Sequence, residues 1–541
     1  MRNIKLTLYL LILHKLSLVS NFLKEIWSGF FIDPKSQLFI NYNKRRWKDA
    51  KSRNNKGEIL VEIYDVDQTV LAFSYVTNIL ARKHNSKIVS FLILNRHPFL
   101  IFLRYRRIFE IYKSFNVFLH VNLRLNNKSL MNRTLLITNN ILKKIESTND
   151  ILVISVNGIV IGADIYESFL RDNKVPTIDI HSFKFKRYLT KSIAIFLFWD
   201  QYFKSHNVKS VVLSHGIYRY GFVKKIANMQ GIPVYLPTVR SLYCLKNEKQ
   251  TGLPPFRSYS IIFSKLTKKE QLSALSWSEK RLKLRFSGKV AVDMHYSSKS
   301  AFVYNARQNK ALKQNNRIKI LIATHCFFDN PHCYGINLFP DFYEWLNFLG
   351  EMSEVTDYDW YIKTHPDVLP GNKEVLNRIL EKYKKITLLN EDVSHLQLKE
   401  EGISFVLTVY GSVGHEYPLL GNVVINAGKN NPHAGYNFNI HCNSISEYRD
   451  LILNLVNLKL NFNKRDVYEF YYMHYKYFGP LNLFFDSFDD FCKNCLQKQI
   501  SSYVYSYFFN EHNEIKDHIL CSKIEKFINS NKYTYTNMGL Y

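Results

Sequence analysis

Lys363, Thr364, His365 and Pro366 form a short motif whose residue types can bind phosphate. An apolar run of strand character precedes the motif. Side chains alternate along a strand, so Lys363 and His365 share one face. Pro366 cannot donate a hydrogen bond to a neighbouring strand and is expected to end this one. An ammonium group and an imidazole at a strand end can neutralise a diphosphate leaving group, whose charge grows as its bond breaks. The alternative is a solvated lysine beside a histidine without a ligand.

A second motif, Gly-Ser-Val-Gly-His-Glu at residues 411–416, follows a later apolar strand. Ser412 is a good N-cap residue, and Gly411 lets a ligand approach the backbone closely. Free N–H groups at a helix start bind phosphate. Glu416 lies about one turn further along, where a carboxylate can accept two ribose hydroxyls. The spacing matches neither a Walker loop nor the G-x-G-x-x-G fingerprint, so an ordinary strand–turn–helix cap is the alternative.

Two D-x-D triplets raise the question of a metal ion. Asp65 and Asp67 follow a predicted strand, and Asp357 and Asp359 precede one. In metal-dependent GT-A transferases such a pair holds a divalent cation on the donor diphosphate. Asp67 also suits the cap of the next helix, and acidic pairs at this spacing are common by chance. We therefore expect no metal at either triplet.

The seven cysteines fit neither a disulfide framework nor a zinc site. Cys492 and Cys495 form one C-x-x-C pair, but a structural zinc ion needs four ligands and no second pair follows. Cys326 and Cys333 lie near two histidines and are a weaker candidate for metal binding. We expect reduced thiols, no metal and no cofactor.

The elements that must position these motifs alternate between strands and helices. Predicted strands cover residues 59–64, 87–94, 117–121, 208–214 and 233–236, and then 318–323, 360–364, 386–389, 405–410 and 423–425. Predicted helices cover 69–83, 100–115, 181–204 and 221–230, and then 341–352, 373–383, 413–420 and 446–456. Residues 150–155 fit a further strand, although their neighbours fit a helix equally well. This repeated order is typical of parallel sheets covered on both faces by helices.

A polar stretch rich in Lys, Ser and Asn separates two such series. The predicted organisation is a basic N-terminal segment (1–57), a Rossmann-like acceptor domain (58–265), a linker region (266–316), a Rossmann-like nucleotide-donor domain (317–456) and a helical C-terminal extension (457–541). Ligands of doubly wound sheets bind beyond the carboxyl ends of the strands. The fold class is therefore α/β, with two doubly wound domains facing a cleft.

The order K-x-H-P, G-S-x-G-x-E and then G-x-V-V-x-x-A-G at residues 421–428 resembles bacterial capsule and surface-polysaccharide biosynthesis glycosyltransferases. The likeness is greatest to the Kdo-transferase-like capsule family. CDP-glycerol polymer transferases and bacterial sialyltransferases share an H-P dipeptide and a Ser/Gly-rich phosphate loop. The resemblance covers roughly residues 317–450, including 324–329 and 342–346, and weakly residues 158–171 and 214–234. It implies a GT-B fold of two Rossmann-like domains, with the donor nucleotide held mainly by the second.

At the matching positions the resemblance implies roles for three residues. His365 would contact the donor phosphate, Ser412 would help to bind it, and Glu416 would hold the nucleoside. Lys363 and Gly411, from the same two motifs, complete the predicted donor site. His325 departs from the family pattern, in which a small residue or proline is expected.

The first domain is expected to supply acceptor contacts and the acid/base group. Asp164 and Glu167 follow the Gly-rich turn at residues 158–162, and His215 follows the strand at 208–214. A carboxylate or imidazole there can deprotonate an acceptor hydroxyl. His215 is the best placed, because it ends a strand that faces the predicted cleft. Each residue alone also fits a structural role, and an inverting and a retaining outcome both stay open.

Charge and composition limit the classes of partner that the protein can have. The chain has 541 residues, 46% of them hydrophobic, as in a globular protein of several domains. Its 73 Lys and Arg against 45 Asp and Glu give +28, which favours anionic partners. Residues 1–57 carry twelve basic and three acidic residues. The densest part is Lys44-Arg45-Arg46-Trp47-Lys48, in which basic residues flank Trp47, and Phe30 and Phe31 precede it. Basic and aromatic side chains together suit an anionic membrane surface, and a solvated basic face is the alternative.

Targeting signals are weak in this sequence. The longest early apolar run, residues 8–13, is shorter than the about 20 residues that span a membrane. The N-terminal region lacks the A-x-A cleavage pattern of a secretory signal, since the first alanine is Ala50. No nucleic-acid-binding motif is present. We expect a cytoplasmic protein, peripheral on the inner face of the membrane, without a nucleic-acid partner.

The sequence thus predicts a GT-B glycosyltransferase that uses a nucleotide-sugar donor, with a CMP-sugar favoured. Its acceptor would be a lipid-linked or polysaccharide chain of capsule or lipopolysaccharide type. Three alternatives stay open. They are a CDP-polyol phosphotransferase for teichoic-type polymers, a sugar-nucleotide epimerase, and a non-catalytic basic protein that binds membranes or polyanions.

Overall fold

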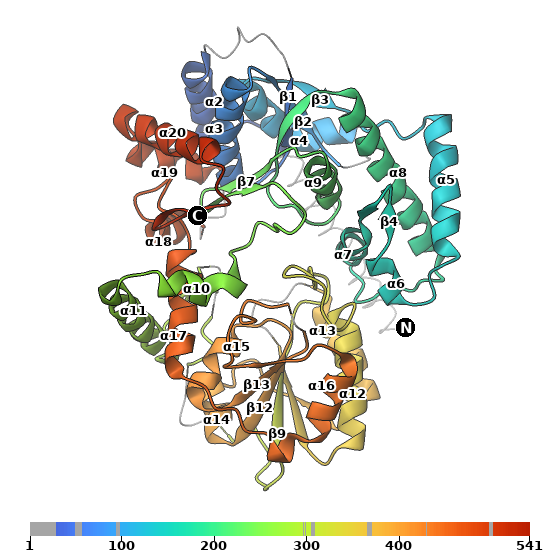
Figure 1. The fold of residues 1–541 in the computed structure, drawn as a ribbon, viewed down its shortest axis with the longest axis vertical. Helices are drawn as coiled ribbons and strands as arrows, with labels where there is room; N and C mark the ends of the chain where they lie inside the picture. Colours follow the sequence, from blue (N-terminus) through green and yellow to red (C-terminus); the bar gives the residue numbers. More distant parts are fainter. Residues whose placement is uncertain are drawn as a thin grey trace, which may run out of the picture.

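The computed structural model describes residues 29–48, 57–93, 98–295, 297, 299–303, 309–364, 370–428, 430–496 and 501–541. Within this part of the chain there are two six-stranded sheets, each with helices packed on its faces (Figure 1). Helices follow the second sheet to the C-terminus. This confirms the predicted α/β class, with two Rossmann-like domains in a GT-B-like arrangement and a helical C-terminal tail.

The first sheet has the strand order β3-β2-β1-β6-β7-β8, in which only β8 runs antiparallel to its neighbour. Its strands are β1 (Glu58–Glu62), β2 (Lys87–Phe91), β3 (Val117–Val121), β6 (Val208–Val212), β7 (Val234–Thr238) and β8 (Ser241–Leu245). Strand β1 is buried along its whole length. A strand covered on both faces loses the alternation of apolar and polar residues, which is why these strands appear as continuous apolar runs.

Helices of the first domain form two apolar cores, one on each face of the sheet. They are α3 (Asp67–Lys83), α4 (Pro98–Ser114), α5 (Lys128–Leu142), α6 (Thr148–Leu152), α7 (Gly162–Asn173), α8 (Phe183–Ser205) and α9 (Tyr220–Met229). A small hairpin, β4 (Ser155–Val156) and β5 (Ile159–Val160), precedes α7. The prediction of a strand at residues 150–155 is wrong over most of that range. Ser147 and Asp150 form a capping box that starts α6 there.

The second sheet is parallel throughout, in the order β11-β10-β9-β12-β13-β14. Its strands are β9 (Lys319–Ala323), β10 (Asp359–Lys363), β11 (Ile386–Leu388), β12 (Ile403–Thr408), β13 (Val423–Asn426) and β14 (Ile440–His441). Its helices are α12 (Phe342–Val355), α13 (Asn372–Lys382), α14 (His395–Glu400), α15 (Val413–Glu416), α16 (Ile445–Leu453) and the 3-10 turns η3 (Pro418–Leu420) and η4 (Leu455–Asn457).

Both sheets have the strand order 3-2-1-4-5-6 when their own strands are counted in sequence. The order reverses between β1 and β6 in the first sheet and between β9 and β12 in the second. Ligands of doubly wound sheets bind at this switch point, outside the carboxyl ends of the strands. A ligand-binding site is therefore expected at the loops after these four strands.

The C-terminal extension returns to the first domain. It contains α17 (Lys464–Tyr472), η5 (Met473–Tyr477), α18 (Phe488–Phe491), η6 (Cys492–Leu496), α19 (Tyr503–Glu511), α20 (Glu514–Asn529), β15 (Tyr535–Thr536) and β16 (Gly539–Leu540). Helix α19 packs against α2 (Pro34–Arg46), and α20 packs against α3. Figure 1 shows these red helices beside the blue helices of the N-terminal part. The extension thus completes a core of the first domain.

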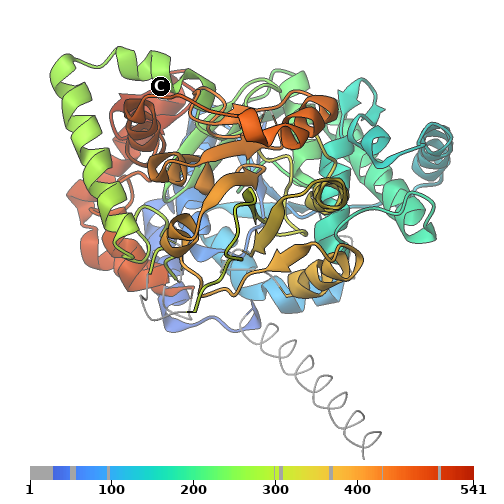
Figure 2. The ribbon, with the colours of Figure 1, turned by 90° about the horizontal axis from the view of Figure 1, so that it is seen from below.

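The linker region contains a long helix that the sequence analysis missed. After η2 (Phe256–Ser258) and α10 (Tyr259–Ser264), helix α11 runs from Lys268 to Phe286. Thr267 and Glu270 form its capping box, and its few buried residues recur four apart, as on one helix face. Helix α11 packs against α17. Figure 2 shows α11, in light green, along one side of the molecule.

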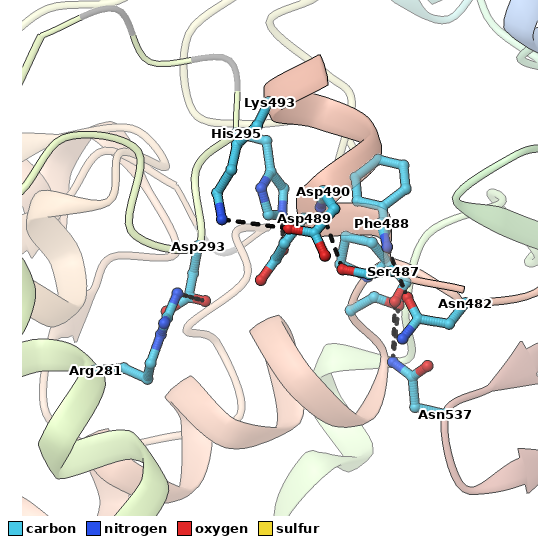
Figure 3. Close-up of polar contacts among 12 residues, drawn as sticks. Arg281, Asp293, His295, Asn482, Ser487, Phe488, Asp489, Asp490, Lys493 and Asn537 are labelled. Carbon is cyan, nitrogen blue, oxygen red and sulfur yellow. Dashed lines mark hydrogen bonds and ion pairs between the residues drawn. The ribbon is translucent and has the colours of Figure 1, made fainter. Parts of the chain in front are cut away.

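Polar contacts fasten the chain after α11 to the C-terminal extension (Figure 3). Arg281 makes a bidentate pair with Asp293, with Nε 2.9 Å from Oδ2 and Nη2 2.7 Å from Oδ1. His295 lies 3.6 Å from a carboxylate oxygen of Asp489, which belongs to α18. These contacts hold residues 281–295 in one place, and that segment borders the candidate site.

The described part of the basic N-terminal segment, residues 29–48, contributes Phe39, Ile40 and Trp47 to a core of the first domain. Trp47 is buried and meets the ring of Tyr75 edge-on, so it is not available to a membrane surface as the sequence analysis had it. Arg46 lies over Trp47 and pairs with Asp517 of α20 at 2.6 Å. Lys44 remains exposed. Among the described residues, no helix combines the length and the apolar character needed to cross a membrane.

Candidate functional site

A cavity of about 570 Å³ lies at the switch point of the second sheet. Its walls come from the loops after β9, β10 and β12 and from the chain after α11. Four of the five predicted donor-site residues line it, namely Lys363, Gly411, Ser412 and Glu416. The fifth, His365, lies outside the described residues. Two motifs that are distant in sequence therefore share one cavity.

Lys363 ends β10 with its side chain almost buried, at 5% exposure. Its ammonium group donates to the carbonyl oxygen of Glu391 at 2.7 Å. Burial lowers the pKa of Lys363 to about 8, although Asp392 and Glu391 favour the charged form. Lys363 is thus still mainly charged at neutral pH, in a place where water competes little for the charge.

The loop after β12 presents unused hydrogen-bond donors to the cavity. The amide of Gly411 donates to Oγ1 of Thr408 at 3.1 Å, and that of Gly414 donates to the carbonyl of Gly411. Ser412 is at the N-cap of α15, but its hydroxyl does not cap the helix as the sequence analysis expected. Within the described chain, the amides of Ser412 and Val413 and the Ser412 hydroxyl make no hydrogen bond. An anion can bind there without displacing a protein contact.

Gly414 is required by the packing behind this loop. A Cβ at Gly414 would lie 2.4 Å from the ring of His433 and 2.9 Å from Asn439. His415, the next residue, places Nδ1 3.2 Å from Nε2 of His433. Burial lowers the pKa of both imidazoles well below the ordinary value. The loop therefore rests on a pair of neutral, buried histidines.

Glu416 has a partner that the sequence analysis missed. Arg285, at the end of α11, places Nε 2.6 Å and Nη2 2.5 Å from Oε1 of Glu416. Burial opposes the charge of Arg285, but Glu416 and two nearby tyrosines leave its pKa above the ordinary value. Oε1 of Glu416 is thus occupied, which leaves Oε2 for the ribose contact that the sequence analysis assigned to this residue.

His325 also lines the cavity and makes several contacts with the residues around it. Its Nε2 accepts from the amide of Val409 at 3.3 Å and lies 3.1 Å from Oγ1 of Thr408. The ring stacks on Phe342 and packs against Tyr410. A smaller residue could not make these contacts. His325 therefore holds the end of β12, from which the loop that contains Gly411 and Ser412 begins.

One aspartate of each acidic triplet, Asp67 and Asp359, is buried and hydrogen-bonded within the protein. Asp67 opens α3 rather than capping it, and accepts from Arg107 and Tyr505, each at 2.9 Å. Asp359 accepts from Asn315 at 2.8 Å. In the described chain, no three His, Cys, Asp or Glu residues lie where they could hold a metal ion. All seven cysteines are free thiols.

His215 follows β6, at the switch point of the first sheet. Its Nδ1 lies 2.5 Å from Oγ of Ser214. Burial, and then the positive charge of Arg171, lower the pKa of His215 to about 4, although Asp329 of the second domain favours the charged form. His215 is therefore neutral at pH 7. Its ring lies 6.1 Å from the ring of Tyr218, whose hydroxyl donates to Asp329 of the second domain at 3.0 Å, so His215 lies on the side of the first domain that faces the second.

Asp164 and Glu167 lie on α7 and have other partners. Asp164 forms an ion pair with Lys225 at 2.6 Å. Glu167 accepts from the amide of His332, in the second domain, at 3.1 Å. Burial raises the pKa of Glu167 well above its ordinary value. The structure thus does not bring these carboxylates together with His215 in one hydrogen-bonded group.

Further contacts join the domains around His215. The hydroxyl of Tyr166 donates to Asp341 at 2.5 Å, and that of Tyr218 donates to Asp329 at 3.0 Å. Arg171 donates to the hydroxyl of Tyr218 at 2.7 Å. Tyr218 has a φ of 53°, a left-handed conformation that side chains rarely adopt. These contacts hold the loop after β6 against the second domain.

Comparisons with known proteins add a likeness of fold. No family model and no curated protein matches the chain. A glycosyltransferase from Rickettsia africae is 11% identical, with a TM-score of 0.23 over 88% of this chain and 100% of that one. A UDP-GlcNAc 2-epimerase from Neisseria meningitidis, bound to UDP-GlcNAc, is 12% identical, with a TM-score of 0.21 over 76% and 97%. An Anabaena protein in complex with UDP and glucose is 9% identical, with a TM-score of 0.23 over 88% and 100%. These values are too low to indicate a substrate.

Proposed function

We propose that this protein is a glycosyltransferase whose donor is a nucleotide sugar held in the cavity of the second domain. One observation carries the proposal. The buried ammonium group of Lys363 and the unbonded donors of Ser412 and Val413 line the same cavity at a switch point. About 570 Å³ is within the usual range of small-molecule sites.

The donor phosphates would lie between Lys363 and the loop that begins at Gly411. As the bond from the sugar to the phosphate breaks, negative charge grows on the leaving phosphate. The Lys363 ammonium group and the amides of Ser412 and Val413 would stabilise this charge with little reorganisation. Glu416, held by Arg285, would direct Oε2 to the ribose. The sequence motif adds His365 to the phosphate contacts.

The acceptor hydroxyl would approach from the first domain. His215 would be the base, because its lowered pKa leaves it neutral at pH 7 and its ring lies beside Tyr218, which contacts Asp329 of the second domain. Asp164 is already paired with Lys225, and Glu167 holds the backbone of the second domain. These two residues would position α7 rather than take the proton.

The finer assignment rests on the sequence resemblance. It favours a CMP-sugar donor and a capsule- or lipopolysaccharide-type acceptor at the inner membrane face. Exposed basic residues such as Lys44 and Arg45 would contribute to attraction by anionic lipids.

Replacement of His365 by alanine tests the donor site. We expect a loss of roughly ten- to a hundredfold in kcat/KM for transfer from the nucleotide sugar, with little change in Tm. His365→Asn should restore little, since it can donate a hydrogen bond but carries no charge. A variant with a lowered Tm and full activity would contradict the proposal. Conversion of UDP-GlcNAc without an acceptor would instead favour an epimerase.

A further inference from the structure

Glu62 is a buried acid at the switch point of the first sheet, next to the proposed base. It ends β1, and its side chain is 0% exposed. Oε2 accepts from the amide of Ser214 at 2.7 Å and from the Ser214 hydroxyl at 2.9 Å. In the described structure, Oε1 is buried without a hydrogen-bond partner. A buried carboxyl with an unpaired oxygen destabilises the fold, which suggests that Glu62 has a function other than stability.

The hydrogen bonds of Ser214 determine the tautomer of His215. A serine hydroxyl has one proton, and Ser214 donates it to Glu62 when Glu62 is ionised. Its Oγ must then accept the hydrogen bond from Nδ1 of His215, 2.5 Å away. Nδ1 therefore carries the proton and Nε2 carries the lone pair. Among the described residues, no group makes a hydrogen bond to Nε2.

We propose that Glu62 is a positioning residue that acts through Ser214 to hold His215 in the tautomer whose Nε2 can accept a proton. This inference rests on the proposed function, in which His215 takes the proton of the acceptor hydroxyl. The carboxylate of Glu62, the hydroxyl of Ser214 and the imidazole of His215 then form one hydrogen-bonded chain across the ends of β1 and β6, which we call the relay.

The proposed transfer step moves one proton and forms one bond for each bond that it breaks. The acceptor hydroxyl gives its proton to Nε2 of His215, which becomes an imidazolium. The acceptor oxygen forms a bond to the anomeric carbon, and the bond from that carbon to the donor phosphate breaks. The electron pair leaves with the phosphate. Glu62 stabilises the imidazolium through Ser214, and the imidazolium later releases its proton to water.

The relay is sensitive to the charge of Glu62. Burial raises the pKa of Glu62 to about 8, and Asp65 adds to this effect, although both hydrogen bonds from Ser214 oppose it. A protonated Glu62 can donate to Oγ of Ser214. The Ser214 hydroxyl then turns to Nδ1 of His215, and the imidazole proton moves to Nε2. The tautomer that can act as a base is therefore favoured as pH rises through about 8.

Other titratable groups lie close enough to Glu62 and His215 to influence their charges. Those coupled to Glu62 are Asp65, Tyr64, Tyr112 of α4 and Tyr220 of α9. Those coupled to His215 are Arg171 of α7 and Asp329 of the second domain. Burial raises the pKa of all three tyrosines, so they stay neutral across the range of the test.

Nitrogen-15 NMR of the full chain with labelled histidine measures the tautomer directly. Loss of its signals in His215→Gln assigns them. At pH 9 the wild type should show a protonated Nδ1 and a bare Nε2, and at pH 6.5 the protonated Nε2 should gain population. Glu62→Gln cannot ionise, and its oxygen must face the Ser214 amide, so it should show the protonated Nδ1 at both pH values. Ser214→Ala should remove the difference between the two pH values.

Transfer rates give the second readout. Lys363 titrates in the same range as Glu62, so the wild-type rate is divided by the Glu62→Gln rate at each pH. This ratio should rise about tenfold from pH 7 to pH 9, as expected for one group with a pKa of about 8. Ser214→Ala should lower kcat by about tenfold with KM nearly unchanged.

Each outcome has one meaning. A protonated Nε2 at both pH values in the wild type would overturn the relay, whatever the activity. The NMR signals could behave as expected while the ratio of rates stays constant with pH. That result would overturn the role of Glu62 and Ser214 in the transfer reaction. Failure of the proposed function would show separately, as an absence of nucleotide binding in a protein whose NMR signals are unchanged. Circular dichroism on each variant checks that the fold is retained.

Discussion

Arg285 and Glu416 form a buried ion pair that joins the end of the linker helix to the wall of the cavity. Nε of Arg285 lies 2.6 Å from Oε1 of Glu416, whose side chain is 2% exposed. The two residues are 131 positions apart in sequence. The linker is therefore part of the candidate donor site as well as a connection between the domains.

Replacement of Arg285 by alanine should destabilise the second domain. It leaves the Glu416 carboxylate buried without its partner, and removal of one member of a buried pair costs roughly 3–5 kcal/mol. Lys283→Ala is the matched control, because Lys283 lies on the same helix in an exposed pair with Glu279. Thermal unfolding should show a lower Tm for Arg285→Ala alone. Equal melting of both variants would mean that the pair contributes nothing.

Replacement of Lys363 by methionine should weaken nucleotide binding by tenfold or more, because a charge-assisted hydrogen bond contributes about 1.5–3 kcal/mol. In the empty site the pKa of Lys363 is about 8, so the positive charge is present below this pH and lost above it. Wild-type affinity for a nucleotide should thus fall from pH 7 to pH 9. Isothermal titration calorimetry at both pH values checks this. An affinity that is constant with pH, and equal in Lys363→Met, would exclude Lys363 from the site.

Replacement of Tyr166 by phenylalanine should loosen the contact between the domains. Tyr166 donates to Asp341 at 2.5 Å, and its loss leaves a buried carboxyl oxygen with one partner fewer, at a cost of roughly 1–3 kcal/mol. Burial raises the pKa of Asp341 to about 6. Small-angle X-ray scattering at pH 7 should give a larger radius of gyration for Tyr166→Phe. An unchanged radius would show that other contacts suffice to hold the domains.

Buried histidines should make the protein less stable as pH falls below about 6.5. Burial lowers the pKa of His332 and His474 to about 4 and that of His395 to about 3. An unfolded histidine titrates near 6.5, so at these three positions the unfolded chain binds more protons than the native one between pH 6.5 and pH 4. The raised pKa of Asp341 acts in the opposite direction and offsets part of this effect. The stabilisation is complete above pH 6.5 and is lost as pH falls.

The melting temperature at pH 7, 6 and 5 tests this effect. Each such histidine contributes at most about 1.4 kcal/mol per pH unit in this range. His474→Phe keeps the ring contact with Phe470 and should show a smaller drop from pH 7 to pH 5 than the wild type. A Tm that stays constant from pH 7 to pH 5 would show that these histidines are accessible to protons in the native state.

The strands and the loops that follow them could be predicted from sequence because their signals are local. The residues of β1, β9 and β12 form apolar runs of strand length, and the loops that follow contain glycine, serine and basic residues. Because ligand sites of doubly wound sheets lie at the carboxyl ends of the strands, the sequence predicts Lys363 and Ser412 at one edge of the sheet.

The partners of these residues could not be predicted, since they depend on tertiary packing. Glu62 looks like one more polar residue at a strand end, and only its burial beside Ser214 gives it a role. Arg285 lies in a polar stretch whose helix could have been found from the capping box of Thr267 and Glu270. No local signal could show that α19 and α20 cover the first domain.

Calorimetric titration with CMP, CDP and UDP is the most direct test of the nucleotide site. We expect at least one of them to bind the wild type and to stabilise it by about 2.7 kcal/mol at a hundredfold excess over Kd. Lys363→Met should bind that nucleotide at least tenfold more weakly. Lys373→Ala, an exposed lysine on α13 outside the cavity, should bind it as the wild type does. If none of the three nucleotides binds at millimolar concentration, or if Lys363→Met binds as tightly as the wild type, the cavity is not a nucleotide-sugar site.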